Sequence, residues 1–240
     1  MIPAPPNLSP DWRTQLRQRF VTQWLIKSLG TICWIASFFT GYFWVLRNPI
    51  AEATVMPLTA LDRIIPFSTH ALVLYVSLWV YVSLAPALVK SFVELFSYGV
   101  ATVVLSAVGL AIFWYLPTTV PVPEVDAFQH SSIAMLRGVD LAGNACPSLH
   151  VAFAVFTGIW MDRILREMRA VRWILAANWL WCAGIVYSTL ATRQHVILDV
   201  IAGAVLGVVV AMLHVRALER FEARWGQAIA RTSIEPLSGS

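Results

Sequence analysis

Two short stretches of the chain place ionisable side chains at the ends of long apolar segments. One is the sequence Pro-Ser-Leu-His at 147–150, and the other runs from Arg193 through His195 to Asp199. Ionisable groups near the hydrocarbon of a membrane are costly unless they are paired or face water, so they indicate a functional site. His195 and Asp199 are four residues apart on one helix face, where the carboxylate can fix the imidazole tautomer and raise its basicity. This pairing is typical of an activated nucleophile or a general base.

The Pro-Ser-Leu-His stretch is typical of the start of a helix. Pro147 suits the first helical position, where a missing N–H costs nothing, and the amides of Ser148 and its neighbours would then be free. A positive helix end with free N–H groups binds phosphate readily, and the Ser148 hydroxyl can donate as well. His150 lies in the same turn and could offer a proton to a leaving oxygen. Taken alone, the stretch is also compatible with an ordinary helix start that carries an incidental histidine.

Together the two stretches could supply a phosphate anchor, an acid and a nucleophile. Phosphoryl transfer needs little beyond positioning and neutralisation of charge, so we expect neither a metal site nor a cofactor. Arg193 precedes His195 by two residues and can bridge phosphate oxygens in a bidentate manner. The alternative for Arg193 is a loop arginine that contacts lipid headgroups.

The composition predicts an integral membrane protein. Hydrophobic residues make up 58% of the 240, charged residues only 12%, and the chain has eleven tryptophans, which is far from a soluble globular domain. Apolar runs of about 20 residues are long enough to span a membrane. Six such runs predict a single domain over 1–240, an all-α bundle of six transmembrane helices. The runs are 28–46, 71–89, 94–116, 148–162, 171–190 and 196–218.

Basic residues divide unequally between the two sides of this six-span arrangement. Of the 17 Lys and Arg residues, 13 fall on the side that holds both ends of the chain. The positive-inside rule therefore predicts cytoplasmic termini, with 1–27 as an N-terminal cytoplasmic or interfacial segment and 219–240 as a tail. The loops before His150 and His195 would face outward, toward a periplasm or lumen. The net charge of +4 thus reflects topology, and we expect the membrane, and no nucleic acid, as a partner.

The N-terminal segment has two interpretations. Residues 11–24 carry several arginines and could form a surface-lying amphipathic helix with those arginines at the headgroups. They could equally be a continuous extension of the first spanning helix.

One connection is much longer than the others. The loop 117–147, of about 30 residues, is rich in proline near its start and lies on the same side as the two histidines. Long connections in compact proteins are usually functional or mobile, and this outward-facing loop could cover a site and carry its specificity.

The last span carries a pattern of small residues. Gly203 and Gly207 are four residues apart, which lets another helix approach closely. The pattern predicts helix packing inside the bundle, with a homo-oligomer as the alternative.

These residues resemble the signatures of the type-2 phosphatidic acid phosphatase (PAP2) superfamily. Residues 147–150 look like its second signature, usually Pro-Ser-Gly-His, with leucine in place of glycine. Ser188, His195 and Asp199 look like its third signature, Ser-Arg-x5-His-x3-Asp, with Thr189 in the position of the arginine. The first signature, Lys-x6-Arg-Pro, does not occur in the sequence. The six-helix plan with both stretches on the outward side is also similar to that family.

The resemblance implies a role for each matching residue. His195 would be the nucleophile that forms a phosphohistidine, Asp199 its orienting partner, and His150 the acid that protonates the leaving group. Ser148 and Arg193 would hold the phosphate, Arg193 by its proximity. The resemblance thus implies a lipid phosphate or phospholipid as the substrate.

Other residues resemble one branch of that superfamily. They are Leu149, the pair Asp140 and Asn144, and the prolines within 115–121. This branch includes inositol phosphorylceramide synthases and related head-group transferases, so the resemblance also implies sphingolipid chemistry.

Three functions are compatible with the sequence. The first is a membrane-embedded lipid phosphatase that transfers the phosphoryl group to water. The second shares the intermediate but passes the group to a lipid or polyol hydroxyl. The third is a non-catalytic bundle, either a transporter or a b-type haem protein that uses His150 and His195 as axial ligands.

Overall fold

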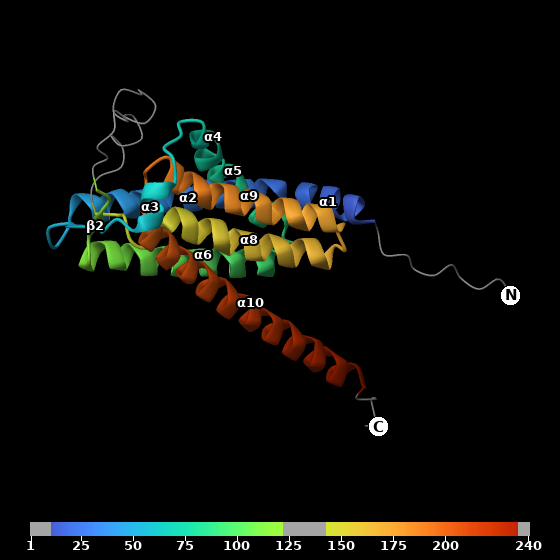
Figure 1. The fold of residues 1–240 in the computed structure, drawn as a ribbon. Helices are drawn as coiled ribbons and strands as arrows, with labels where there is room; N and C mark the ends of the chain where they lie inside the picture. Colours follow the sequence, from blue (N-terminus) through green and yellow to red (C-terminus); the bar gives the residue numbers. More distant parts are fainter. Residues whose placement is uncertain (1–10, 122–142, 235–240) are drawn as a thin grey trace, which may run out of the picture.

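A computed structural model of the chain shows a bundle of long helices (Figure 1). The structure describes residues 11–121 and 143–234. Most of the predicted outward loop 117–147, including Asp140, lies outside the described residues, as do 1–10 and 235–240.

The described elements are almost entirely helical. Two strands of two residues each, β1 (Thr54–Val55) and β2 (Thr118–Thr119), pair in parallel at one end of the bundle, called here the strand end. The opposite end, which carries the first helix, is called the α1 end (Figure 1). The helices are α1 (Trp12–Val21), α2 (Trp24–Arg47), α3 (Ala60–Ile64), α4 (Ala71–Val76), α5 (Leu78–Leu88), α6 (Phe92–Tyr115), α8 (Leu149–Glu167), α9 (Arg172–Ala191) and α10 (Ile197–Ile234).

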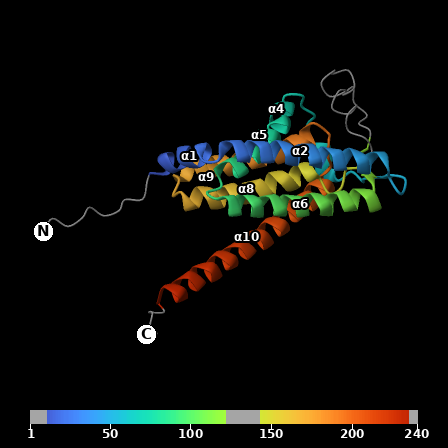
Figure 2. The ribbon, with the colours of Figure 1, turned by 180° about the vertical axis from the view of Figure 1, so that it is seen from behind.

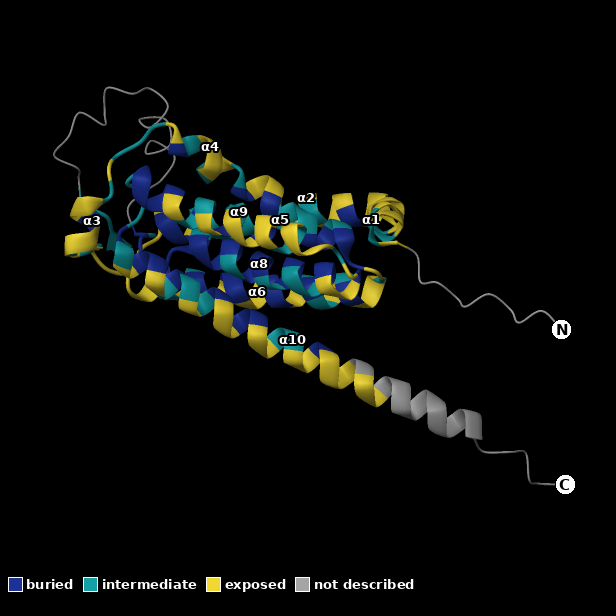
Figure 3. Cartoon of the chain, turned by 45° about the vertical axis from the view of Figure 1, so that its right-hand side comes forward, coloured by how far each residue is buried: buried dark blue, intermediate teal, exposed yellow. Residues whose placement is uncertain are grey.

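The prediction of an all-α membrane bundle is confirmed. Every predicted span coincides with helical structure, the second with two helices. Within the described residues five spans are long and apolar enough to cross a membrane: α2, α4 together with α5, α6, α9 and α10. The fourth predicted span corresponds to α8, which is not apolar enough to be one of these five. Charged side chains such as Asp162 and Arg163 occupy its last turns. It runs through the middle of the bundle, where it is mostly buried by protein (Figure 3). A helix enclosed by its neighbours does not need an apolar surface all round.

The second predicted span is broken rather than continuous. Ser77 separates α4 from α5, and α4 lies off the line of α5 (Figure 1). The Ser77 hydroxyl donates to the carbonyl oxygen of Leu74 at 2.7 Å and accepts from the Trp181 indole N–H at 2.9 Å. These bonds satisfy polar groups at the break and tie it to α9.

The N-terminal segment forms a helix of its own. Gln23 has a positive φ of 56° and interrupts the backbone between α1 and α2, so α1 does not simply continue the first span. Trp12 and Leu16 pack against the hydrophobic core, and Arg19 contacts Glu167 at the end of α8 at 3.0 Å. The helix therefore packs against the bundle and not only on a membrane surface.

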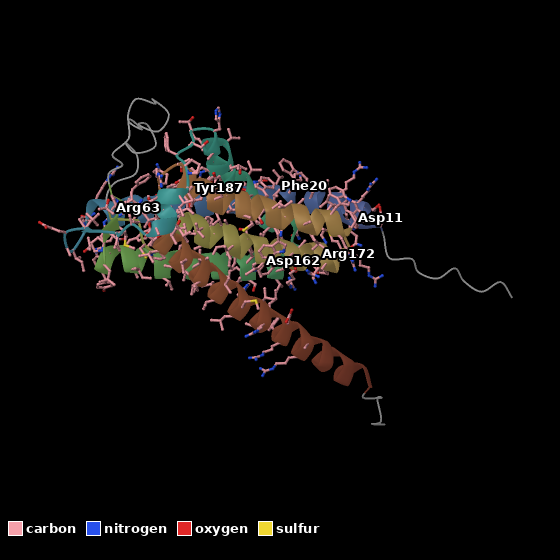
Figure 4. All side chains as sticks on the ribbon, viewed as in Figure 1. Asp11, Phe20, Arg63, Asp162, Arg172 and Tyr187 are labelled. Carbon is pink, nitrogen blue, oxygen red and sulfur yellow. The ribbon has the colours of Figure 1, made fainter. Side chains whose placement is uncertain are left out.

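Charged side chains mark the two ends of the bundle. Arg63 lies near the strand end, whereas Asp11, Asp162 and Arg172 lie toward the α1 end (Figure 4). The helix α10 crosses the bundle obliquely, and its C-terminal half points away from the other helices on the α1 side (Figures 1 and 2). The long apolar surfaces between these ends, together with the five candidate spans, indicate an integral membrane protein.

The closest helix contact in the core joins α8 and α10. A Cβ atom added to Gly203 would lie 2.3 Å from the carbonyl oxygen of Ser148, and one added to Gly207 would lie 2.5 Å from that of Ala152. Only glycine permits two backbones to approach this closely. The small-residue pattern of the last span is therefore used inside the bundle.

We expect Gly203→Ala to lower the free energy of unfolding by about 1–3 kcal/mol, because the new methyl group overlaps the Ser148 carbonyl and forces the helices apart. Thermal unfolding of the purified protein in detergent measures this change. The matched control is Gly30→Ala on α2, where an added Cβ meets no atom within 4 Å. The control should be neutral or slightly stabilising, since alanine has the better helix propensity. Equal unfolding midpoints for the two variants would contradict the close packing.

Candidate active site

The two stretches identified in the sequence meet at the strand end through a backbone hydrogen bond. The Ser148 N–H donates to the carbonyl oxygen of Asp199 at 3.0 Å. The Ser148 hydroxyl accepts from the Val151 N–H at 3.2 Å, so Ser148 is the N-cap of α8. The prediction that Pro147 begins the helix and leaves the Ser148 amide free is therefore wrong. Serine is a better N-cap than proline. The Ser148 N–H is already bonded to a carbonyl oxygen of α10.

His195 and Asp199 face each other at the start of α10. The distance from His195 Nδ1 to Asp199 Oδ2 is 3.5 Å, longer than a well-formed hydrogen bond. The same Oδ2 accepts from the Val196 N–H at 3.0 Å, and Asp199 is fully buried. Catalytic hydrogen bonds are often long in structures without substrate and shorten when it binds. The buried carboxylate is thus placed to orient the imidazole.

His150 and His195 line the same cavity, which has a volume of about 330 Å³. The His150 ring stacks on Tyr75 of α4, with ring centres 4.0 Å apart and an interplanar angle of 15°. His150 Nε2 is buried and has no hydrogen-bond partner among the described residues. Tyr75 therefore holds the ring in place from one side, while Nε2 on the same ring is buried without a partner in the described part of the chain. The sequence carried no signal for Tyr75, because its contact with His150 joins distant parts of the chain.

The rest of the cavity is largely aromatic and apolar. Its walls come from α2, α4, α5, α6 and α8, and Asn144 adds a polar side chain. Within the described residues, no group of three His, Cys, Asp or Glu side chains could hold a metal ion. The other lining residues are Trp34, Phe38, Phe39, Tyr42, Phe43, Val76, Leu78, Trp79, Val82, Phe113, Leu149 and Phe153.

Ser148, Asp199 and Arg193 do not line this cavity. Ser148 and Asp199 are fully buried behind the two histidines. The Arg193 guanidinium donates to the backbone carbonyl oxygens of Asp62 at 2.6 Å and Ile65 at 2.8 Å. In this structure Arg193 thus fastens the loop around α3, and its predicted phosphate contact stays a prediction.

Asp62 connects α3 to the start of α10 and was missed as a site component from sequence. One carboxylate oxygen accepts from the Thr59 N–H and hydroxyl, both at 2.7 Å, and the other accepts from the Ile197 N–H at 2.8 Å. The side chain is buried. The Thr-x-x-Asp spacing at 59–62 is a helix-capping signature and could have marked this residue. Asp62 thereby supports the backbone next to His195.

Cys146 lies close to the site but is not a competing nucleophile. Burial raises the pKa of its thiol, and the nearby Asp199 carboxylate raises it further. Its backbone N–H donates to the Thr118 hydroxyl at 2.8 Å, which joins this segment to β2. The thiol therefore stays protonated at neutral pH.

Comparison with known proteins gave one family match. The model of the PAP2 superfamily matches residues 95–222, more than half of the chain, from α6 into α10. The matched region includes both stretches that supply the histidines. No curated protein and no solved structure matched the chain.

We expect Asp62→Ala to lower the free energy of unfolding by about 1–3 kcal/mol, because buried donors of Thr59 and Ile197 lose their acceptor. Glu52→Ala in the same connection, where the side chain is exposed, should change stability by less than about 0.5 kcal/mol. Thermal unfolding of both variants makes the comparison. If Asp62→Ala unfolds at the wild-type temperature, Asp62 does not anchor α10.

Proposed function

The chain belongs to the PAP2 superfamily, and we propose that it is a membrane-embedded lipid phosphatase acting through a phosphohistidine at His195. Membership supports a phosphatase or phosphotransferase function in general, in preference to a transporter or a haem protein. The observation that carries the finer proposal is the shared cavity of His150 and His195, with the Asp199 carboxylate behind His195. The apolar lining of that cavity is suited to an amphiphilic substrate.

In the proposed first step, His195 attacks the phosphorus of the bound lipid phosphate. Because Nδ1 faces Asp199, Nε2 is the attacking nitrogen. A P–N bond forms while the P–O bond to the lipid breaks, and the leaving oxygen takes a proton from His150. In the second step water attacks the phosphohistidine, His150 accepts the proton of that water, and inorganic phosphate leaves. Asp199 stabilises the imidazolium that forms on His195.

Phosphate binding is assigned to Ser148 and Arg193 as part of the same proposal. The Ser148 hydroxyl lies at the N-cap of α8, two residues before His150, and the bond that it accepts from the Val151 N–H leaves its own proton for a phosphate oxygen. An incoming phosphate would compete with the carbonyl oxygens of Asp62 and Ile65 for the Arg193 guanidinium. A charge-assisted bond to phosphate is the stronger of the two interactions.

The arrangement also supports an orientation in the membrane. The histidines lie near the strand end, whereas α1 and the turn between α8 and α9 lie at the α1 end, where the basic residues are concentrated (Figure 1). The positive-inside rule then favours cytoplasmic termini and an active site on the outward face.

A transferase of the inositol phosphorylceramide synthase type is the second candidate. The aromatic lining of the cavity favours it, because such walls limit access of water and can hold an amphiphilic alcohol. Incubation with a lipid phosphate donor and a lipid or polyol acceptor distinguishes the phosphatase from the transferase by their products. Release of inorganic phosphate without a new lipid supports the phosphatase, and a new phosphorylated lipid supports the transferase.

We expect His195→Ala to abolish turnover and to remove the phosphoenzyme, which can be trapped with radiolabelled lipid phosphate as an acid-labile adduct. Asp199→Asn should lower kcat by about 10²–10⁴-fold because the imidazole loses its orienting carboxylate. Asp162→Asn, at the far end of α8, is the matched control and should keep its activity. A phosphoenzyme that persists in His195→Ala would refute the assignment of the nucleophile.

His150→Ala is expected to slow hydrolysis most when the leaving group is poor. An acid assists departure of an alkoxide by about 10²–10⁴-fold, whereas a nitrophenolate leaves without that help. The measurement compares kcat/KM for an alkyl phosphate and for p-nitrophenyl phosphate. An equal loss on both substrates argues against His150 as the acid.

Single cysteines introduced into a background free of Cys33, Cys146 and Cys182 should report the orientation. Ile64→Cys on α3 is highly exposed and should react with a membrane-impermeant maleimide from the outward side. Arg224→Cys on α10 should react only after the cytoplasmic side is opened. The reverse pattern would overturn the proposed topology.

A further inference from the structure

A second apolar cavity lies directly beside the one that the histidines line. It has a volume of about 160 Å³ and lies between α2, α5, α6 and α8. Trp34, Val82 and Phe153 line both cavities, so the two cavities are adjacent and share these side chains as a common wall. The rings of Trp34 and Phe153 meet edge to face with centres 5.5 Å apart and flank the junction. We call the combined space the α2 groove.

The α2 groove extends far from the histidines along the membrane-spanning direction. Its lining on α2 runs from Phe43 to Gly30, which at 1.5 Å per residue is about 20 Å. The hydrocarbon of a bilayer is about 30 Å thick. The groove is therefore long enough to hold an extended hydrocarbon chain over about two thirds of the thickness of the bilayer hydrocarbon.

Two glycines leave space unfilled in the second cavity. Gly30 on α2 and Gly99 on α6 both line it, and a Cβ atom added at either position would meet no atom within 4 Å. Gly109, Gly203 and Gly207 differ, because an added Cβ there would collide with a neighbouring helix. The first two glycines therefore keep space open in the groove, whereas the other three allow helices to pack closely.

We propose that the α2 groove binds one hydrocarbon chain of the phosphorylated substrate, and that Gly30 and Gly99 set the chain length that the enzyme accepts. This inference rests on the proposed phosphatase function. The occupant is identified by the position of the second cavity directly beside the histidine cavity and by the apolar lining of both. A chain that enters at the junction between Trp34 and Phe153 places its far end beside the two glycines while its phosphate lies at His195.

The length preference arises from fit and not from hydrophobic burial. A chain in the lipid bilayer is already in an apolar surrounding, so transfer into the groove gains little from leaving water. If a larger side chain at Gly30 or Gly99 fills the second cavity, a long chain can no longer be fully inserted. Its phosphate is then held away from His195. A short chain stops before the obstruction and reacts as before.

The test measures kcat/KM for alkyl monophosphates from octyl to hexadecyl, together with p-nitrophenyl phosphate. Gly30→Leu and Gly99→Leu should each lower the value for hexadecyl phosphate at least tenfold and leave octyl and nitrophenyl phosphate within twofold of wild type. Ala36→Leu places the same leucine side chain on an exposed face of α2 and should change none of these values. An unchanged length profile, or an equal loss on every substrate, would overturn the proposal.

A second measurement does not depend on turnover. Hexadecyl phosphate with a diazirine at the end of its chain should crosslink to Thr31, Leu95 or Tyr98 in the wild-type protein, located by mass spectrometry. The same crosslinks should be lost in Gly30→Leu. If none of the phosphates is hydrolysed but the crosslinks form, the proposed phosphatase function fails and the chain site stands. Crosslinks confined to the outer faces of the helices would refute the chain site.

Discussion

The close approach of α8 and α10 is the contact on which the candidate site depends. Gly203 and Gly207 bring the backbone of α10 against the carbonyl oxygens of Ser148 and Ala152. At this distance the Ser148 N–H reaches the Asp199 carbonyl oxygen. The start of each helix is thereby fixed relative to the other, and the two histidines, His150 in the first turn of α8 and His195 just before α10, are brought to one cavity. Larger residues at positions 203 and 207 would move the starts of α8 and α10 apart.

Buried charged groups with polar partners hold the two ends of the bundle. At the strand end, Asp62 receives hydrogen bonds from the start of α10. At the α1 end, Glu94 pairs with Arg163 at 2.5 Å, and the Lys27 ammonium donates to the carbonyl oxygens of Ala87 and Val89 at 3.0 and 2.9 Å. Charges near a membrane are tolerated when they are paired in this way. The groove between these ends can therefore stay apolar.

The break between α4 and α5 links the fold to the histidines. A straight second span would follow the bundle axis, but the turn at Ser77 sets α4 apart (Figure 1). Tyr75, on α4, then stacks on His150. The imidazole is held by this ring on one side and lines the cavity, and its buried Nε2 has no protein partner among the described residues. An apolar, preorganised setting of this kind strengthens electrostatic interactions with a bound phosphate.

The sequence by itself determined the helical regions, the membrane class and the spacing of His195 and Asp199, because periodicity and local composition are properties of neighbouring residues. It also indicated that Gly203 and Gly207 form a packing face. Only the tertiary structure decided that the Ser148 amide is occupied and that Tyr75 supports His150. Those contacts join residues that are distant along the chain, so they depend on how the helices pack.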